Sequence, residues 1–590
     1  MSEKIDDGQP EQQLPDTSFE NSTGKKSKPV SHGSRWHRLK DWYLERKKWT
    51  VPLTVLLFLL IIAVVPFTRY YVAGLALKKD VSLTVVDSTA NTPVSGATVT
   101  IGSVSAQADS TGKATLHRVK VGNHKATISK KYYQTSTIYI LAPILNQKNI
   151  SRAQLIATGR QVKVTIRNTI DKTPLKNVNI KAAGTTAKTD SDGSAILVLP
   201  VGTSEQKAIL SLDSYNEAEV NIKVSNDKIQ DNQFTLTPAG KVYFLSKLSG
   251  KIDVVKTNLD GTERHTVMAG TGREDDQNTV LLASRDWKYL ALLSRRAGNN
   301  PILYLIDASN DSASTIDEGT TDLSLTGWVD SNFVYTATSR SVNIWQPGRQ
   351  IMKSYNALSK KTTNLDQTTA SGSGQFDYLG ETFGGIYAYN GQVFYIKNWT
   401  ASYGGSSMSQ LQTKQATFNS VKSDGTGKKA IKSFALASGS SSADITVEER
   451  VQNPDSTSLK FYDGSKDNFY VYTNGQVKDD ANMNPQLFYS SNYPTYLQSP
   501  SANDTFWAEP RDGKNTLFIG NEDGQKGKQI ASLSEYFTYG WFTDDYLLVS
   551  KNSSELYIMP KGGSKNPVKI SDYHKPVQNF YGYGGGYGGI

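Results

Sequence analysis

Hydrophobic and polar residues alternate in short runs over most of the chain after residue 80, and turns rich in Gly, Pro, Asn and Asp separate the runs. Val81, Leu83 and Val85 form one such run, and Ala97, Val99 and Ile101 form the next. A period of two over runs of this length predicts β-strands with one buried face. We therefore expect this part of the chain to be all-β.

One segment near the N-terminus has a different pattern. The run "WTVPLTVLLFLLIIAVVPFT", residues 49–68, carries no charge, and a helix of this length spans about 30 Å, the thickness of a hydrocarbon core. We predict one transmembrane helix over 49–72, preceded by a disordered cytoplasmic tail (1–33) and a basic juxtamembrane segment (34–48). A cleaved signal peptide is the alternative, with "GLA" at 74–76 as its cleavage site.

The flanking charges predict the orientation of this helix. Six Lys or Arg residues lie within 35–48 and three within 69–79, and the more basic flank stays in the cytoplasm. The expected location is the cell membrane, single-pass, with a cytoplasmic N-terminus and an extracytoplasmic bulk. The lipid bilayer is then a partner through residues 49–72.

Residues 81–158 and 162–237 repeat one pattern. "DSTG" at 109–112 matches "DSDG" at 190–193, and "KVG" at 120–122 matches "PVG" at 200–202. Several short strands joined by such turns predict two small β-sandwiches, at 80–158 and 160–238. We interpret the Asp residues of these turns as turn caps, because the longer ligand run of a calcium loop is absent.

Three motifs carry a family resemblance: "PVSGATV" at 93–99, "TDSDG" at 189–193 and "LPVG" at 199–202. On these motifs each repeat resembles a carboxypeptidase-regulatory-like or PEGA-type domain, a transthyretin-like β-sandwich. The second repeat departs from the pattern with "PLKNVNI" at 174–180, and the first lacks the Leu-Pro pair. The resemblance implies spacers or stalks that present a ligand-binding part, without catalysis.

A looser unit recurs from residue 241 onward with a period of about 40–45 residues, typical of a propeller blade. Units begin near 241, 279, 322, 383, 443, 495 and 536. We predict a seven-bladed β-propeller over 240–582, with six or eight blades as alternatives, followed by a Gly/Tyr-rich tail at 583–590. The units resemble TolB-type or WD-like propellers, and "PVQNFYGYG" at 576–584 is the expected closing strand of the first blade.

Candidate chemistry is sparse. The chain has no Cys, which excludes disulfides, thiolate metal sites and a thiol nucleophile. Its six His residues lie in no HExxH motif, and no GxSxG motif occurs. A carboxylate cluster at 270–276 ("GTGREDD") is either a cation site or, more commonly, a solvated loop. We predict no catalytic residue, no cofactor and no metal, and no nucleic-acid partner, because the basic excess lies beside the apolar run.

Aromatic residues supply the remaining candidates. We interpret Trp287, Trp328, Trp345, Trp507 and Trp541 as core residues between blades, and Trp399 and Tyr403, in a Gly/Ser-rich loop, as ligand-binding residues. The expected function is a membrane-anchored surface protein whose propeller binds an extracytoplasmic protein or a cell-envelope polysaccharide. The alternative is an extracytoplasmic glycan hydrolase or lyase with its site in the propeller funnel.

Overall fold

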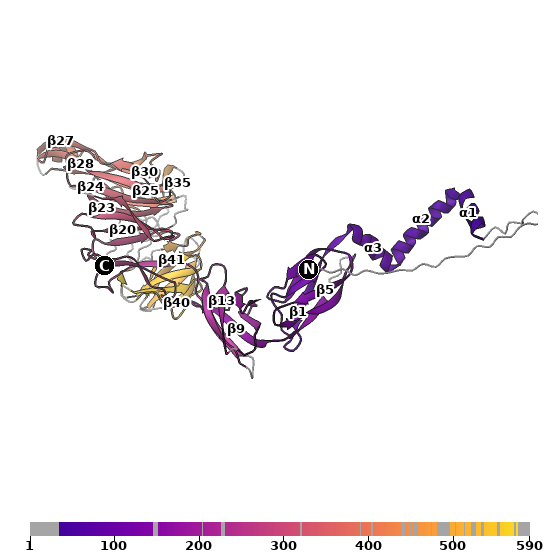
Figure 1. The fold of residues 1–590 in the computed structure, drawn as a ribbon. Coiled ribbons are helices and arrows are strands. Elements are labelled where there is room, and N and C mark those ends of the chain that lie inside the picture. The colour runs from indigo at the N-terminus through magenta and orange to yellow at the C-terminus, as the bar shows by residue number, and fades with distance from the viewer. Residues whose placement is uncertain are drawn as a thin grey trace, which may run out of the picture.

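A computed structural model shows three parts that follow one another along an elongated molecule: N-terminal helices, two small β-sandwiches and a large β-rich body (Figure 1). The described residues are 35–144, 151–202, 204–225, 230–318, 321–389, 391–402, 405–437, 443–447, 451–452, 458–473, 475–480, 496–501, 503–511, 514–520, 527–532, 536–551, 555–571 and 574–575. The predicted tails at 1–33 and 583–590 lie outside these residues.

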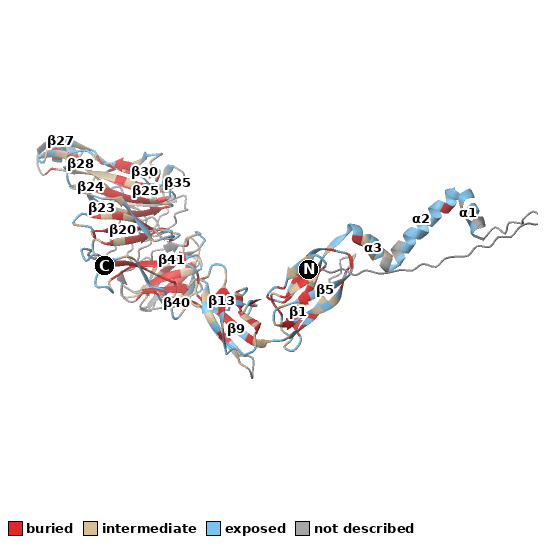
Figure 2. Cartoon of the chain, in the orientation of Figure 1, coloured by how far each residue is buried: buried red, intermediate tan, exposed pale blue. Residues whose placement is uncertain are grey.

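The N-terminal region contains three helices, α1 (Arg35–Glu45), α2 (Lys47–Val64) and α3 (Pro66–Ala76). The segment 49–72, predicted as one transmembrane helix, is divided between α2 and α3 in the structure. Val65 has extended backbone angles (φ −78°, ψ 116°) and Pro66 starts α3, since a residue that precedes proline is disfavoured in the α conformation. The apolar side chains of α2 are exposed (Figure 2). Among the described helices, none combines the length and the apolar character needed to cross a membrane.

The first sandwich, module 1, packs two four-stranded sheets, β4-β1-β8-β6 and β3-β2-β5-β7, around one apolar core. Its strands are β1 (Lys78–Asp87), β2 (Thr98–Ile101), β3 (Val104–Gln107), β4 (Lys113–Lys120), β5 (Gly122–Ser129), β6 (Tyr133–Gln134), β7 (Ser136–Ala142) and β8 (Ser151–Ala157).

The second sandwich, module 2, repeats this arrangement with the sheets β11-β10-β13-β14 and β12-β9-β15. Its strands are β9 (Arg160–Asn168), β10 (Asn179–Ala182), β11 (Thr185–Lys188), β12 (Ser194–Leu199), β13 (Glu205–Ser211), β14 (Ala218–Lys223) and β15 (Gln230–Leu236).

The Asp-x-x-Gly turns have the same geometry in both modules, and the turn-cap interpretation is confirmed. Oδ1 of Asp109 accepts the backbone N–H groups of Thr111 and Lys113 at 2.8 and 3.0 Å, and Oδ1 of Asp190 accepts two equivalent N–H groups at 2.9 Å. The glycine that closes the turn, Gly112 or Gly193, has φ +76° or +72°. A Cβ atom there would lie 2.4–2.5 Å from a carbonyl oxygen of the neighbouring strand, so only glycine fits.

The two modules are joined by direct hydrogen bonds. Lys130 of module 1 donates its ammonium group to the carbonyl of Ser95 (2.6 Å) and to that of Thr186 in module 2. Nζ of Lys131 and the hydroxyl of Tyr132 both donate to the Ala183 carbonyl, at 2.7 and 3.1 Å. The joint is therefore a bonded interface in addition to the chain connection.

The C-terminal body contains seven sheets of four or five strands within the described part of 242–575. The sheets are β18-β17-β16-β45, β19-β20-β21-β22, β23-β24-β25-β26, β27-β28-β29-β30-β31, β32-β34-β35-β36, β33-β37-β38-β39-β40 and β41-β42-β43-β44. Apolar clusters join the second sheet to the third, the third to the fourth, the fourth to the fifth and the sixth to the seventh, and the first, second and seventh sheets share one cluster. This is a β-propeller.

The elements of the first four propeller sheets are β16 (Val242–Ser246), β17 (Asp253–Thr257), β18 (His265–Met268), β19 (Val280–Ala283), β20 (Tyr289–Ser294), β21 (Ile302–Asp307), β22 (Ser312–Asp317), β23 (Thr321–Val329), β24 (Asn332–Ser339), β25 (Gln350–Asn356), β26 (Lys361–Gln367), β27 (Ala370–Gly374), β28 (Asp377–Tyr389), β29 (Gln392–Ala401), helix α4 (Gly405–Leu411), β30 (Gln415–Lys422) and β31 (Lys429–Ala435).

The remaining strands are β32 (Ile445–Val447), β33 (Val451–Gln452), β34 (Ser458–Asp463), β35 (Asn468–Thr473), β36 (Gln476–Asp479), β37 (Tyr496–Gln498), β38 (Thr505–Arg511), β39 (Lys514–Gly520), β40 (Lys528–Ser532), β41 (Tyr536–Thr543), β42 (Tyr546–Lys551), β43 (Glu555–Pro560), β44 (Val568–Lys569) and β45 (His574–Lys575).

The fourth sheet departs from the sequence-based boundaries. It begins at Ala370 in β27 rather than near 383, because the Gly-rich stretch before 383 pairs as the hairpin of β27 and β28. Gly and Ser have low β-propensity, so tertiary pairing decides the structure here.

The first sheet is completed from the C-terminus, as expected. The pairing strand is β45, in which His574 pairs with Ser246 and Lys575 with Leu245. It lies just before the predicted segment 576–584, which is outside the described residues.

Buried tyrosines join neighbouring sheets. The hydroxyl of Tyr335 donates to Asp317 of the preceding sheet at 2.8 Å, and that of Tyr395 donates to Asp366 at 2.7 Å. Burial and the adjacent carboxylate raise the pKa of both tyrosines, so each remains a hydrogen-bond donor at neutral pH.

Module 2 is bonded to the propeller. Nδ2 of Asn168 donates to the Tyr546 hydroxyl at 2.9 Å, and the hydroxyl of Thr237 donates to Asp260 at 2.6 Å. Ile170 of module 2 belongs to the apolar cluster shared by the first, second and seventh sheets. Module 2 and the propeller are therefore one packed unit at this joint.

The module joint predicts a pH dependence of stability. Burial lowers the pKa of Lys130 from its ordinary value of 10.5 to about 8. Between pH 8 and 10.5 the unfolded chain holds a proton that the folded chain lacks, so the free energy of unfolding rises with pH across this window. We expect the difference in unfolding free energy between wild type and Lys130→Met, measured by urea titration, to shift in favour of wild type as the pH rises from 7.5 to 10. A difference that is the same at both pH values would contradict this assignment.

Candidate functional site

The structure describes one of the two residues predicted to bind ligand. Trp399 lies on β29, half-buried, with Nε1 donating to the Gln415 carbonyl at 3.1 Å and the ammonium of Lys414 4.7 Å from its ring centroid. Tyr403 lies outside the described residues. The face of Trp399 is thus already covered by a cation from its own sheet.

The carboxylate loop at 270–276 uses its acidic groups locally. The buried carboxylate of Glu274 accepts the N–H groups of Thr271 and Gly272 and lies 3.7 Å from the Arg296 guanidinium. Asp275 caps the N–H groups of Gln277 and Asn278. No three His, Asp or Glu side chains gather as metal ligands in the part of the chain that the structure describes.

Four of the five tryptophans interpreted as core residues are buried: Trp287, Trp328, Trp507 and Trp541. Trp345 is not a core residue. It is half-buried in the connection between β24 and β25, with its ring centroid 6.1 Å from that of Tyr378.

A cavity of about 550 Å³ lies where the chain passes from module 2 into the propeller. In the second and seventh sheets, a short turn joins the first strand to the second, at Ser284–Lys288 and after Thr543. The first sheet has no such turn, because its first strand is the C-terminal β45. The linker from module 2 occupies that place instead, and a hollow remains between the flanking turns.

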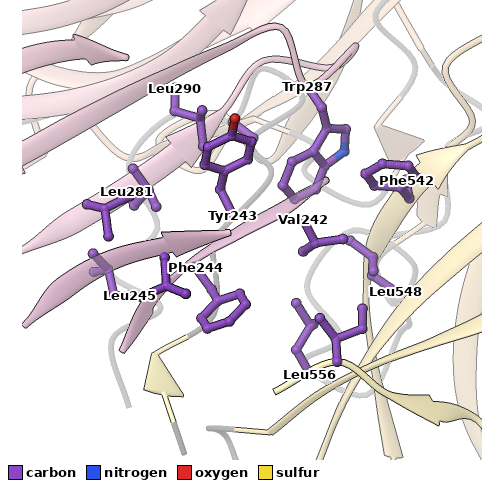
Figure 3. Packing of buried hydrophobic residues seen from close by; sticks show 14 of the residues in the cluster. Val242, Tyr243, Phe244, Leu245, Leu281, Trp287, Leu290, Phe542, Leu548 and Leu556 are labelled. Carbon is purple, nitrogen blue, oxygen red and sulfur yellow. The ribbon is translucent and has the colours of Figure 1, made fainter. Parts of the chain in front are cut away.

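The inner wall of this cavity is aromatic. Trp287 and Phe542 lie side by side above Val242, with ring centroids 5.3 Å apart (Figure 3). The indole Nε1 of Trp287 donates to the Trp541 carbonyl at 3.4 Å. Tyr243 and Tyr289 complete the aromatic lining. The volume and aromatic content are typical of small-ligand sites.

The rim of the cavity is polar and balanced in charge. It carries two lysines and two aspartates together with hydroxyl groups: Lys241, Lys288, Asp286, Asp307, Ser309 and Thr543. Lys288 lies 3.0 Å from Asp286, and the Asp307 carboxylate accepts the N–H and the hydroxyl of Ser309 at 2.9 and 2.6 Å. The lining therefore offers both hydrogen-bond donors and acceptors without a net charge.

Asp286 is fully ionised near neutral pH. Partial burial favours a higher pKa, but hydrogen bonds from Lys288 and Ser284 outweigh it and hold the pKa of this carboxyl below its ordinary value. Burial and the neighbouring Asp311 raise the pKa of Tyr243. Both groups are thus fixed hydrogen-bonding partners at neutral pH.

Trp287 has an unusual backbone conformation. Its φ is +58°, in the left-handed region that glycine favours, although its side chain is large and 6% exposed. In the turn between β23 and β24 of the third sheet Asp330 has φ +52°, and in the turn between β28 and β29 of the fourth Gly391 has φ +68°. Residues held in this region cost free energy and persist where packing enforces them. Here the packing that places the indole in the cavity wall maintains the conformation.

One short stretch of the sequence carries a signal for this site. In "SRDWKY", residues 284–289, a Trp stands where a tight turn ordinarily carries Gly or Asn. The cavity itself was not predictable, because it results from ring closure between residues more than 250 positions apart.

Replacing Trp287 by Gly tests how strongly packing dominates. Removal of backbone strain favours the variant by about 1–3 kcal/mol, and the loss of buried aromatic contacts disfavours it by about 3–5 kcal/mol. We expect Trp287→Gly to lower the free energy of unfolding by about 2 kcal/mol in urea titrations followed by circular dichroism. Trp345→Gly is the matched control and should change stability less. A more stable Trp287→Gly chain would show that strain is the larger effect.

Comparison with known proteins does not assign this chain to a family. No family model matches it, and no curated protein matches it. Among solved structures, TolB from Acinetobacter baumannii aligns at 12% identity over 63% of this chain and 78% of its own, with a TM-score of 0.28.

Two further structures align at similar levels. The β-propeller domain of the Trilobed protease from Pyrococcus furiosus aligns at 12% identity over 64% of this chain and 95% of its own (TM-score 0.30). Oligogalacturonate lyase from Vibrio parahaemolyticus aligns at 9% identity over 56% and 85% (TM-score 0.30). At such scores none of these structures informs the site.

Proposed function

We propose that this chain is a membrane-anchored, non-enzymatic surface protein whose propeller binds an uncharged saccharide unit of a cell-envelope polymer. The observation that carries the proposal is the cavity at the junction of module 2 and the propeller, with its aromatic wall and its polar rim. Two β-sandwiches present this propeller as a stalk, in keeping with the sequence resemblance of each module to carboxypeptidase-regulatory-like domains.

The lining favours a saccharide over other ligands. Sugars combine apolar C–H faces, which pack on aromatic rings, with hydroxyl groups that need both donors and acceptors. Trp287, Phe542 and Tyr289 supply rings, and Asp286, Lys288 and Ser309 surround them. A strongly charged ligand is disfavoured, because the two lysines and two aspartates of the rim offer no excess of either sign.

The stalk supports presentation of the site at a distance from a membrane. Hydrogen bonds connect module 1 to module 2 through Lys130, and module 2 to the propeller through Asn168. The uncharged run at 49–68, with Leu53 and Phe58 exposed on α2, is the segment that would hold the chain in the bilayer.

A bulky side chain at the cavity rim should block binding. Ser309 is exposed in the turn between β21 and β22, so Ser309→Trp fills the cavity without disturbing a core residue. We expect binding of neutral oligosaccharides from cell-envelope polymers, measured by titration calorimetry on the full chain, to weaken at least about tenfold, equivalent to 1.4 kcal/mol.

The control is Leu358→Trp. Leu358 occupies the same turn position in the next sheet and is 68% exposed, and it does not line the cavity. It should bind as wild type does. Equal affinity of wild type and Ser309→Trp would place the saccharide elsewhere, and the failure of all neutral oligosaccharides to bind wild type would refute the proposal.

A glycan hydrolase or lyase is the second candidate, because Asp286 and Asp307 face one cavity. Glycoside hydrolysis uses two carboxyl groups, one of them a general acid with a raised pKa. The lowered pKa of Asp286 disfavours that role. If a glycan screen detects turnover by wild type, and Asp286→Asn or Asp307→Asn abolishes it, the hypothesis of a glycan-acting enzyme replaces the proposal of a non-enzymatic binding protein.

The proposed location has its own test. Protease added to intact cells should digest the chain beyond Lys79 and leave residues before the apolar run protected. Protection of the propeller with loss of the N-terminal segment would reverse the orientation.

A further inference from the structure

Strand β7 is an edge strand of module 1 with an apolar outer surface. It pairs with β5 on one side, and no strand in the described part of the chain pairs with its other side. Tyr139 is 73% exposed and Leu141 is 41% exposed on its outward face. Exposed edges of this kind are templates for pairing with another strand, and most proteins protect them.

Module 2 supplies an internal comparison for this edge. Ala126 of β5 pairs with Ile138, and its counterpart Ala208 of β13 pairs with Val220. This register matches the outward residues of β7 with those of β14: Thr137 with Glu219, Tyr139 with Asn221 and Leu141 with Lys223. The same strand is thus polar and charged in module 2 and uncharged in module 1.

The edge of β14 is also capped by a side chain. Asn232 donates to the carbonyl of Lys223 at 3.0 Å and accepts its N–H at 2.8 Å, so it satisfies both backbone groups of an edge residue. The strand registers place Ser151 of β8 at the matching position of module 1. Its short hydroxymethyl side chain replaces the amide that caps β14. The charged outward residues and the capping amide that protect the edge in module 2 are therefore both replaced in module 1.

We propose that β7 pairs with β7 of a second copy of this chain and forms an antiparallel, two-fold symmetric dimer through module 1. This inference is independent of the ligand of the propeller.

The chemistry of the strand favours a second copy as its partner. Ser136–Ala142 reads "STIYILA" and carries no charge, so two copies meet without like-charge repulsion. A two-fold axis at Tyr139 sets that tyrosine opposite itself and Thr137 opposite Leu141, which gives apolar cross-strand pairs on the outward face. An acidic or basic peptide would find no complementary charge on this strand.

The contact is small, and this sets the expected strength. One seven-residue strand pair buries less than the roughly 1,200–2,000 Å² of a stable interface. We therefore expect reversible association of the free chain. Confinement of anchored chains to one membrane would raise their effective concentration and favour the dimer.

The absence of Cys from the chain permits a direct test. Facing residues of antiparallel strands have Cα atoms about 4.5–5.5 Å apart, within the range that a disulfide bridges. We expect the full chain with Tyr139→Cys, concentrated in detergent and mildly oxidised, to give about tenfold more disulfide-linked dimer than the matched control Asn221→Cys on β14. A mixture of Thr137→Cys and Leu141→Cys chains should also cross-link as a pair.

Sedimentation equilibrium supplies the second measurement. The wild-type chain should show a monomer–dimer equilibrium, and Tyr139→Lys, which makes the β7 edge polar as in β14, should shift it to monomer. Equal cross-linking of Tyr139→Cys and Asn221→Cys would overturn the proposal. A wild-type chain that is monomeric at all concentrations would also overturn it.

Discussion

The propeller depends on one packing interaction, the apolar cluster that joins the first, second and seventh sheets. A ring of sheets is stable only if its last sheet packs on its first, and here that contact includes Trp287 beside Phe542 (Figure 3). Ile170 of module 2 belongs to the same cluster. The interaction that closes the ring therefore also fixes the stalk to it, and the candidate site is the hollow that this arrangement leaves.

A chain without Cys must gain its stability from burial and hydrogen bonding. The inter-sheet bonds meet this need repeatedly: Tyr335 with Asp317 and Tyr395 with Asp366 each join one sheet to the preceding one. Similar links through Lys130 and Asn168 hold the modules in line. The result is an elongated molecule in which every joint between the sandwiches and the propeller carries side-chain bonds (Figure 1).

Local patterns in the sequence predicted much of this architecture. Alternation at Val81, Leu83 and Val85, and the Asp-x-x-Gly turns, predict strands and turns that the structure contains, because these features depend on neighbouring residues. Features set by distant contacts were not predictable. The pairing of the Gly-rich stretch in β27 and β28, and the cavity beside Trp287, both arise from residues that meet only in the folded ring. The helix break at Val65 is different, since it follows from Pro66 next to it in the sequence, which disfavours the α conformation at Val65.

The closing strand has a mechanical consequence. Among the residues that the structure describes, two residue pairs join β45 to β16, and β16 is also the first propeller strand after module 2. Tension applied through module 2 would enter the ring at β16 and at the side chains that bond module 2 to the propeller, Asn168 and Thr237. Under load the propeller would unzip from its two ends at once, with the remaining sheets intact until the first has peeled away.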